Sequence, residues 1–346
     1  MIRFNCDYSE GAHPRILERL AQTNLEQLPG YGQDTYCLQA AETIKQLCAA
    51  PQAAVHFISG GTQTNLTVIA AFLRSYQGVL APDCGHINVH EAGAIEMTGH
   101  RILTAPHRNG KITAEQVSRL CREHWQDDNP EFAPQPKMVY ISFPTEFGTL
   151  YSKQELYDLR RACDENGLYL FMDGARLGYG LTAEENDVSW QDVATCCDVF
   201  YIGGTKLGAL LGEAVVITNP KLQKDFRYTM KQHGAILAKG RILGIQFLTL
   251  FQDGLYLQLA AHANRMAALI RTACEEARFS FLYPSPTNQQ FPIVPNEILK
   301  DLEQQYVFSH LKPYDHNHSA IRICTSWATR EEDVRQFITD LKRLTE

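Results

Sequence analysis

The stretch Val199-Phe200-Tyr201-Ile202-Gly203-Gly204-Thr205-Lys206 joins an apolar run, typical of a buried strand, to a lysine. A second apolar run, Leu168 to Met172, precedes it in the chain and ends at Asp173. Consecutive strands of a parallel sheet place the side chains at their carboxyl ends in one crevice, where open α/β sheets bind their ligands. An amine and a carboxylate in that crevice predict a site for pyridoxal phosphate.

The segment around this stretch, from about residue 55 to 218, alternates strand-like and helix-like runs. Such alternation is typical of a mostly parallel sheet covered by helices. Amphipathic helices are expected at 114–125 and 153–166, and the crossovers are long enough for right-handed β-α-β units. Seven strands are expected, at 55–58, 78–81, 101–104, 138–141, 168–172, 199–202 and 214–217.

Beyond Pro220 the alternation gives way to long helical periodicity, over 222–233 and then 242–277 with an interruption near Asp253-Gly254. A compact region follows, with strands expected at 279–282 and 320–324 and helices at 296–305 and near the end of the chain. Because 346 residues exceed one typical hydrophobic core, we expect two domains. Residues 1–245 would form a large catalytic domain, whose N-terminal segment could pack on a smaller α/β domain over residues 246–346.

The composition is that of a globular protein with a small-molecule ligand. The chain is 45% hydrophobic and 21% charged, and its net charge of −7 lacks the basic footprint of a nucleic-acid binder. Its ten cysteines show no C-x-x-C pair, which is typical of reduced cytoplasmic thiols. The N-terminus lacks a signal-peptide pattern, and no apolar stretch reaches the length of a membrane span. We therefore expect a cytoplasmic protein without nucleic-acid or membrane partners.

A glycine-containing segment, Ser59 to Asn65, follows the first expected strand and leads into a helix. Gly60 and Gly61 let backbone amides approach an anion, Thr62 adds a hydroxyl group, and a helix N-terminus is electropositive. The segment therefore predicts a phosphate cradle, although it is not a Walker motif. An ordinary glycine turn capped by Thr62 is the alternative.

The motif Asp173-Gly174-Ala175-Arg176 carries two further candidates. In a pyridoxal site, the Asp173 charge would keep the pyridine nitrogen protonated, and Arg176 could hold a substrate carboxylate with two hydrogen bonds. A structural Asp–Arg pair is the alternative. Lys206 would form the Schiff base with the cofactor, its pKa lowered in an enclosed site, whereas a surface lysine after a turn is the alternative.

The segment His86-Ile87-Asn88-Val89-His90-Glu91 offers a third group of candidates. His86 could stack on a cofactor ring and move protons. The pair His86 and His90 with Glu91 could instead bind zinc, but the order differs from H-E-x-x-H and no third ligand is apparent. An ordinary histidine at a helix start is the remaining alternative. We expect no metal.

Taken in order, these segments resemble the threonine aldolase family, a branch of the β-eliminating lyase group with the aspartate-aminotransferase type of fold, called fold type I. The resemblance extends over nearly the whole chain. It implies a phosphate loop at Ser59–Asn65, a stacking histidine at His86, a pyridine-nitrogen and carboxylate motif at Asp173–Arg176, and a Schiff-base lysine at Lys206. Pyridoxal 5'-phosphate is the implied cofactor.

The resemblance implies further site residues and an oligomer. Asp7 falls in an N-terminal Ser-Asp position, with Cys6 in place of the serine, and is expected to bind the substrate. Arg322 matches a second arginine for the substrate carboxylate. Pro29 to Asp34 resembles a segment near a subunit interface. The family forms at least a homodimer, commonly a tetramer, with active sites at the interface. One basic residue reaches the neighbouring subunit's phosphate site, and the candidates are Lys231, Lys239 and Arg241.

One segment departs from the family pattern. Many threonine aldolases carry a second histidine after the strand equivalent to 138–141, where this chain reads Pro144-Thr145-Glu146-Phe147-Gly148. Glu146 could replace that histidine at the substrate, or His86 or a water molecule could act as the base. The preferred β-substituent and stereochemistry therefore stay open.

The leading hypothesis is a lyase that cleaves β-hydroxy-α-amino acids, such as L-threonine or L-allo-threonine, to glycine and an aldehyde. Another β-eliminating lyase or an aminotransferase is the alternative, because cofactor residues do not fix which bond at Cα breaks. A non-catalytic regulator that binds the cofactor is conceivable. A dinucleotide-binding oxidoreductase is also considered, since residues 178–183 match G-x-G-x-x-A, although their position after Asp173 does not suit that fingerprint.

Overall fold

A seven-stranded sheet organises most of the chain in the computed structural model, which describes residues 1–345. The strand order is β2-β8-β7-β6-β5-β3-β4, and only β8 runs antiparallel to its neighbours. All seven predicted strands are present, so the mostly parallel sheet is confirmed. The strands are β2 (Ala54–Ile58), β3 (Gln77–Pro82), β4 (Arg101–Ala105), β5 (Gln135–Ser142), β6 (Tyr169–Asp173), β7 (Val199–Gly203) and β8 (Glu213–Ile217).

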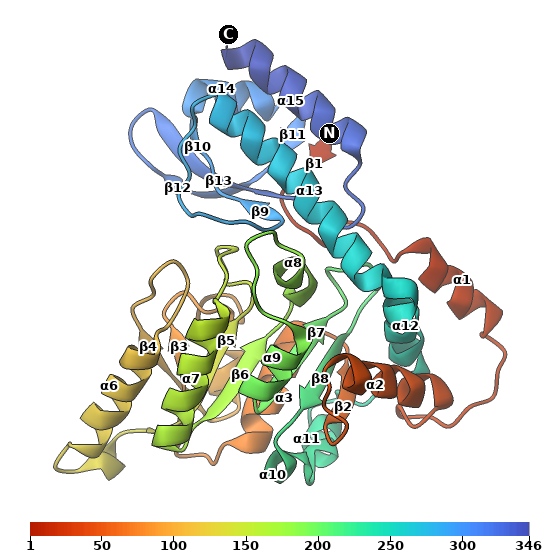
Figure 1. Ribbon diagram of the computed structural model, residues 1–346, viewed down its shortest axis with the longest axis vertical. Coiled ribbons are helices and arrows are strands. Elements are labelled where there is room, and N and C mark those ends of the chain that lie inside the picture. The colour runs from red at the N-terminus through yellow and green to blue at the C-terminus, as the bar shows by residue number, and fades with distance from the viewer. Residues whose placement is uncertain (346) are drawn as a thin grey trace.

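The central strands are mostly apolar because both faces of the sheet are covered. Along β6, Leu170 and Met172 belong to one hydrophobic core, whereas Phe171 between them belongs to the other. This alternation is the period of two that a strand imposes. The first core includes α6 (Ala114–Trp125), α7 (Lys153–Asn166) and α9 (Trp190–Cys196), and the second includes α3 (Gly61–Phe72), α5 (Ala94–Met97) and α11 (Phe226–Gln232). Figure 1 shows this layered arrangement.

Local capping sets the limits of the crossover helices. Capping boxes precede three helices, with Thr113 before α6, Ser152 before α7 and Ser189 before α9. In each box the hydroxyl oxygen of the capping residue accepts a hydrogen bond from the backbone amide three residues later, and the side chain of that later residue accepts one from the amide of the capping residue. Gly167, with φ of 65°, ends α7 in the left-handed conformation that glycine adopts readily. These helix ends depend on residues that are close together in the sequence. The predicted limits of both α6 and α7 therefore match the structure.

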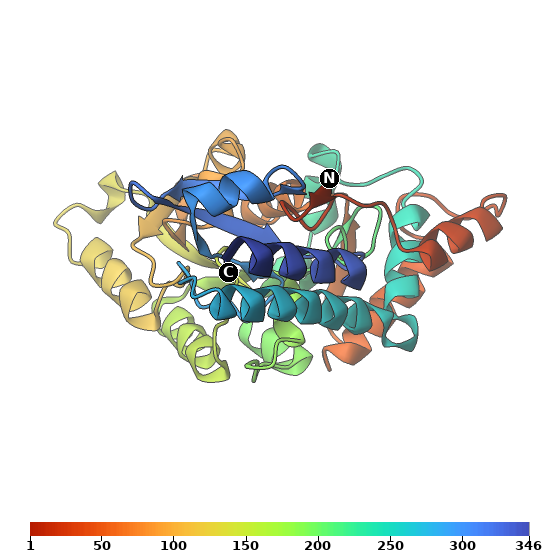
Figure 2. The ribbon, with the colours of Figure 1, turned by 90° about the horizontal axis from the view of Figure 1, so that it is seen from above.

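A second unit lies above the carboxyl ends of the large sheet and has its own core (Figures 1 and 2). Its central strand, β13 (His318–Cys324), pairs antiparallel with β9 (Gln289–Gln290), β10 (Ile293–Pro295) and β12 (Ser309–Pro313). The helices α13 (Leu255–Glu276), α14 (Asn296–Leu302) and α15 (Glu331–Thr345) pack on it. At the N-terminus, β1 (Ile2–Arg3) pairs in parallel with β11 (Tyr306–Val307), so the chain begins in this second unit.

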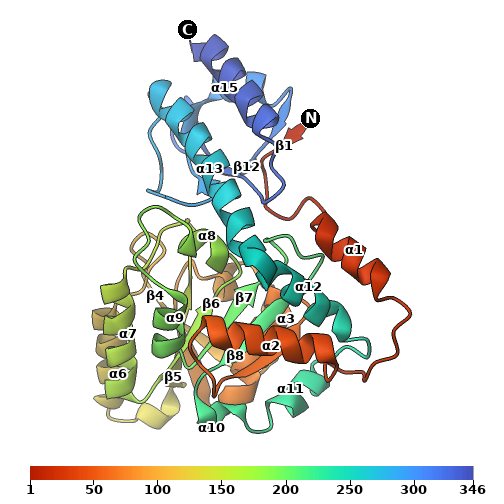
Figure 3. The same ribbon diagram turned by 45° about the vertical axis from the view of Figure 1, so that its right-hand side comes forward.

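The remaining helices connect these parts, and Figure 3 shows α12 leading into α13. The predicted helix at 222–233 is interrupted, because Asp225 adopts a φ of 64° that no α-helix accommodates. Residues 279–282 contribute an isolated bridge, between Phe281 and Pro292, rather than the predicted strand.

Within the described residues, no helix has both the length and the hydropathy that a membrane span requires. The other helices are α1 (Pro14–Gln22), α2 (Thr35–Leu47), α4 (His86–Val89), α8 (Leu177–Leu181), α10 (Pro220–Gln223), α12 (Arg241–Phe251), η1 (Pro130–Phe132) and η2 (Gln252–Gly254).

Candidate active site

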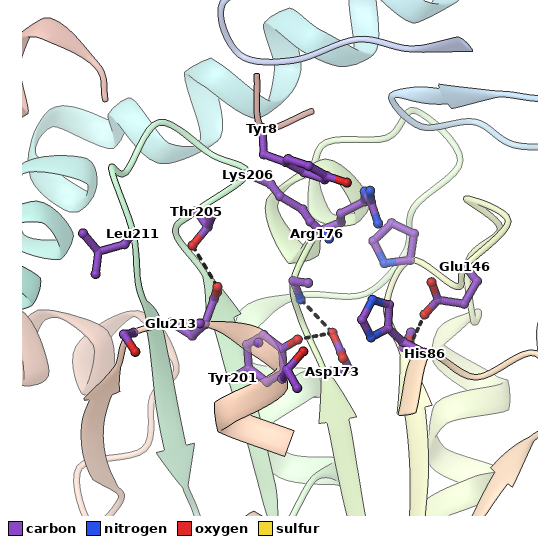
Figure 4. Close-up of a pocket in the computed structure, with 17 residues that line it drawn as sticks. Tyr8, His86, Glu146, Asp173, Arg176, Tyr201, Thr205, Lys206, Leu211 and Glu213 are labelled. Carbon is purple, nitrogen blue, oxygen red and sulfur yellow. Dashed lines mark hydrogen bonds between the residues drawn. The ribbon is translucent and has the colours of Figure 1, made fainter. Parts of the chain in front are cut away.

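A cavity of about 310 Å³ opens at the carboxyl ends of β5, β6 and β7 (Figure 4). Parallel strands bring residues that are far apart in the sequence to this edge of the sheet, as their spacing predicts. Eight of the residues singled out from the sequence line this one cavity: Gly60, Gly61, Thr62, His86, Glu146, Asp173, Arg176 and Lys206. The cavity is also lined by Tyr8, Ser59, Ser142, Pro144, Ala175, Tyr201, Thr205, Leu211 and Glu213.

The glycine-containing segment forms the N-terminal end of α3 at one side of the cavity. Gly60 is the N-cap residue in an extended conformation, and it offers no side chain to satisfy the first amides of the helix. Those amides are therefore available to an anion, and the helix dipole favours one. Thr62 lies inside the first turn rather than at the N-cap, so the alternative in which it merely caps the helix is wrong.

Asp173 ends β6 at the floor of the cavity and is held by hydroxyl and amide donors. The Tyr140 and Tyr201 hydroxyls donate to its two oxygens at 2.6 and 2.5 Å, and Asn65 Nδ2 donates at 3.2 Å. Burial raises the pKa of this carboxyl, but the charge of His86 and the two tyrosine hydrogen bonds outweigh it, so that the pKa is lowered. An ionised carboxylate at this depth can pair with a protonated ring nitrogen.

His86 begins α4 and is fixed by a buried acid. Its Nδ1 lies 2.7 Å from Oε1 of Glu91, whose side chain is fully buried, and the same oxygen accepts from Asn65 Nδ2 at 2.7 Å. Since Asn65 also contacts Asp173, one amide joins the two acids of the site. Burial lowers the pKa of His86, but the Glu91 hydrogen bond and the charges of Glu146 and Asp173 raise it overall. The other ring nitrogen, Nε2, is left for the cavity.

Lys206 follows β7 and extends into the cavity beneath Tyr8, with its Nζ atom 6.0 Å from the centre of the tyrosine ring (Figure 4). Burial lowers the pKa of the lysine, and the neighbouring Arg176 charge lowers it further. A larger fraction of the amine is therefore neutral and nucleophilic at working pH. The alternative of a surface lysine after a turn is wrong.

Arg176 is nearly buried and forms an ion pair with Asp7. Its Nε donates to Asp7 Oδ2 at 2.7 Å and its Nη2 donates to Oδ1 at 3.0 Å. Burial raises the pKa of Asp7, but Arg176, Lys206 and a hydrogen bond from Asn288 lower it to about 2. Asp7 is fully buried and lies behind Arg176, which itself lines the cavity. The arginine is thus both part of an ion pair and accessible to a ligand.

A second chamber of about 500 Å³ adjoins the first and shares its Tyr8, His86, Glu146, Arg176 and Lys206. Arg322, from β13 of the C-terminal unit, faces this chamber. Its Nη2 donates to the backbone carbonyl of Asn5 at 3.1 Å, next to the segment that carries Asp7. Glu146 accepts a hydrogen bond from the Ser142 hydroxyl at 2.9 Å. The two arginines therefore approach one space from the two units.

The three basic candidates for a neighbouring phosphate site lie apart from the two chambers. Lys231 has its amine 4.8 Å from the ring centre of Tyr31, and Arg241 donates to the backbone carbonyls of Asn24 and Glu26. Lys239 is exposed and lines an open groove with Pro29 and Gly30. The groove combines two of the basic candidates, Lys239 and Arg241, with part of the segment that resembles a subunit interface.

Two alternative sites are not supported. Among residues 1–345, one group of three potential metal ligands is close enough to share an ion, and it consists of Asp83, Cys84 and His107 rather than His86, His90 and Glu91. The two glycines of the G-x-G-x-x-A match, Gly178 and Gly180, lie where neighbouring side chains pack closely. A Cβ on Gly178 would lie 2.8 Å from Tyr256, and one on Gly180 would lie 2.6 Å from Phe143, so both glycines allow close packing of α8.

Sequence reasoning missed several residues that complete the site. Tyr140 and Tyr201 stand inside apolar runs, where an aromatic residue is read as core, yet both hydroxyls reach Asp173. The strand period of two connects the tyrosines with Asp173. Asp173 lies two residues after Phe171 and therefore on the same face of β6. Phe171 shares a hydrophobic core with Tyr140 and Tyr201, so the two tyrosines lie on the side of the sheet that Asp173 faces. Asn65, Tyr8 and Glu213 carried no comparable signal.

The geometry fits pyridoxal phosphate. The N-terminal end of α3 suits its phosphate, the ionised Asp173 suits its ring nitrogen, and the Lys206 amine suits its aldehyde carbon. These three features line one cavity, so a single molecule that carries these three polar parts can contact all of them.

A model of the beta-eliminating lyase family matches residues 7–296. The chain belongs to this family. It is 30% identical to the low specificity L-threonine aldolase of Pseudomonas aeruginosa, over 98% of this chain and 97% of that protein. A solved structure described as Leishmania major threonine aldolase is 44% identical, with a TM-score of 0.97 and full coverage of both chains. Thermus thermophilus aspartate aminotransferase is 14% identical, with a TM-score of 0.72 over 99% of this chain and 91% of that chain, and shows the fold alone.

These similarities confirm four predictions from the sequence: the family, the aspartate-aminotransferase type of fold, a pyridoxal-phosphate-dependent lyase and its cofactor.

Proposed function

We propose that this lyase cleaves β-hydroxy-α-amino acids, such as L-threonine or L-allo-threonine, to glycine and an aldehyde. The end-to-end similarity to proteins named threonine aldolase carries the proposal. The two joined chambers support it, because they offer a space for the cofactor beside one for a small amino acid.

The cofactor would be held by four parts of this chain. The backbone amides of Gly60, Gly61 and Thr62 bind the phosphate, Asp173 binds the ring nitrogen, His86 stacks on the ring, and Lys206 supplies the amine that attaches it. When bound, pyridoxal phosphate supplies an electron-accepting ring that stabilises negative charge at the substrate Cα. The hydroxyls of Tyr140 and Tyr201 keep Asp173 ionised for this purpose.

Two arginines orient the substrate by its carboxylate. Arg176 and Arg322 face the shared chamber, and a guanidinium group binds a carboxylate through two parallel hydrogen bonds. We expected Asp7 to contact the substrate itself. Its complete burial behind Arg176 instead favours a positioning role, in which it fixes the arginine and balances its charge. This fixed geometry lowers the entropy lost when the substrate reaches a reactive pose.

His86 is our candidate for proton transfer with the β-hydroxyl group. Its Nδ1 is engaged by Glu91, which leaves Nε2 for the substrate. Glu146 lines both chambers and is steadied by Ser142, so it can accept a hydrogen bond from the same hydroxyl group. In this arrangement Glu146 stands at the substrate hydroxyl in place of the second histidine that many threonine aldolases carry.

The protein would act as a homodimer or homotetramer in the cytoplasm. Leu25 and Leu38 are exposed apolar residues close in sequence to the groove lined by Pro29, Gly30 and Lys239, and burial of such residues is a common basis of subunit contacts. Ten free thiols suit a reducing compartment. We retain the domain division at residues 245 and 246 as part of this proposal, with Arg322 supplied by the smaller domain.

Aldehyde release tests the function directly. The four stereoisomers of threonine and phenylserine are each incubated with the protein, with and without added pyridoxal phosphate, and aldehyde and glycine are measured. We expect both products in equal amounts from at least one isomer, and none with Lys206→Ala. 2-Oxobutanoate from threonine, or phenylpyruvate from phenylserine, with an equal amount of free ammonia would indicate β-elimination. A β-hydroxy-α-keto acid without free ammonia or glycine would indicate transamination. Absence of aldehyde from a yellow, folded protein would reject the aldolase proposal.

A further inference from the structure

Glu213 is a buried acid at the edge of the cofactor cavity to which no role has been assigned above. It begins β8, is 4% exposed and lines the cavity. Its two oxygens accept hydrogen bonds from the Thr205 hydroxyl at 3.0 Å and from the Gly204 amide at 3.2 Å. Both donors immediately precede Lys206 in the chain, so the acid is attached to the turn that carries the lysine (Figure 4).

The Thr205 hydroxyl completes the attachment. Its oxygen accepts from the Gly212 amide at 3.0 Å while it donates to Glu213, so its orientation is fixed from both sides. Glu213 and Gly203 are also cross-strand partners of β8 and β7. The loop between the two strands is therefore closed at its base by one carboxyl group and one hydroxyl group, with Lys206 inside the loop.

The charged and titratable groups that face Glu213 are few. They are Lys206 from the same loop, Asp173 from β6, Tyr201 from β7 and Tyr256 from α13. Burial raises the pKa of Glu213 to about 8, although the Thr205 hydrogen bond and the Lys206 charge act in the opposite direction. Burial therefore favours the neutral carboxyl and moves its ionisation to higher pH than that of an exposed glutamate.

We propose that Glu213 is a positioning residue for the reactive lysine. It fixes the turn through Thr205 and Gly204, and when it loses its proton it favours the charged form of the Lys206 amine. The ionised carboxylate and the ammonium group attract each other in a buried site, which makes the two titrations interdependent. The proposal rests on the role of Lys206 proposed above, but not on the identity of the amino acid that is cleaved.

The charge effect is tested on the full-length, cofactor-free protein with Glu213→Gln. Lys206 is labelled with traces of acetic anhydride from pH 6 to 11, and its modification is measured by peptide mass spectrometry. The glutamine cannot ionise, so Lys206 should titrate at lower pH and react about threefold faster near pH 9, which corresponds to about half a pH unit. Glu184→Gln, at an exposed position, is the matched control and should titrate like the wild type. A Lys206 titration unchanged by Glu213→Gln overturns this part.

The contact is tested with Thr205→Val and Thr205→Ser. Pyridoxal phosphate is added to each cofactor-free protein, and the rate at which the visible absorption of the bound cofactor develops is followed. We expect valine to slow this capture about tenfold, because the lysine is misplaced, and serine to restore it. Equal rates for valine and wild type overturn the positioning role, and this pair decides the outcome even if Glu213→Gln does not fold. If the Glu213 and Thr205 variants both behave as expected but the wild type releases no aldehyde, only the proposed function is contradicted.

Discussion

The carboxylate of Asp7 pairs with two nitrogens of the Arg176 guanidinium, at 2.7 and 3.0 Å, although 169 residues separate them in the chain. Both side chains are nearly or fully buried. Removing one partner of a buried ion pair leaves an uncompensated charge, which typically costs about 3–5 kcal/mol. The pair therefore links the geometry of the site to the stability of the fold.

We expect Asp7→Ala to lower the free energy of unfolding by about 3 kcal/mol and to raise KM for the amino acid about tenfold or more. Asp7→Asn should lose less stability, because its amide oxygen can still accept from Arg176. Denaturant unfolding and steady-state kinetics measure the two effects. A KM unchanged by Asp7→Ala would mean that Asp7 does not position Arg176 for the substrate.

The same pair predicts an acid limit of stability. The pKa of Asp7 is lowered from 3.8 to about 2, so its contribution is complete above pH 3.8 and is lost as pH falls toward 2. A shift of this size corresponds to about 2 kcal/mol. Comparing the unfolding of wild type and Asp7→Asn at pH 5 and pH 2.5 should show a smaller difference at the lower pH. A difference independent of pH would exclude this linkage.

Asp173→Asn tests the charge opposite the ring nitrogen. The amide keeps the shape of the side chain but not its negative charge, so kcat should fall by at least about 100-fold, as for other preorganised electrostatic contacts. The visible spectrum of the bound cofactor should change as well. Tyr157→Phe is a matched control, because its hydroxyl contacts Asp192 outside the cavity. Unaltered kcat in Asp173→Asn would remove Asp173 from the mechanism.

Glu91→Gln tests how His86 is held in its charged form. The Glu91 hydrogen bond raises the pKa of His86, so the glutamine should lower that pKa and move the corresponding limb of the pH–rate profile to lower pH. Because a raised histidine pKa stabilises the fold below pH 6.5, the variant should also lose stability mainly at low pH. NMR titration of the His86 ring gives the pKa directly. A ring that titrates as in the wild type would contradict the assignment.

Glu146→Gln separates binding from proton transfer at the substrate hydroxyl. If Glu146 binds this group while His86 transfers its proton, the variant should raise KM several-fold and lower kcat less than about tenfold. Ser142→Ala removes the hydroxyl that steadies Glu146 and should have a weaker effect in the same direction. A fall in kcat of about 1000-fold with unchanged KM would identify Glu146 as the base.

The site residues that the residue pattern predicts without the family resemblance all follow strand ends. Asp173 and Lys206 follow apolar runs, and a parallel sheet brings such ends together whatever the intervening chain does. The contacts of Asp7 and Glu213 could not be predicted in this way. Asp7 depends on how the N-terminal segment crosses between the two units, and Glu213 reads as a polar residue at the start of a strand. The helix break at Asp225 was also not predicted, because the apolar periodicity of 222–233 does not reveal that this residue adopts a φ of 64°.

The N-terminal seven residues connect both halves of the substrate site. Ile2 and Arg3 pair with β11 in the C-terminal unit, while Asp7 pairs with Arg176 at the large sheet, and Arg322 comes from the C-terminal unit. Arg322 and Arg176 are therefore connected through the few residues between Arg3 and Asp7, whose two ends are held by different units. This short connection restricts how far the two arginines can move apart, and so it sets the width of the space between them.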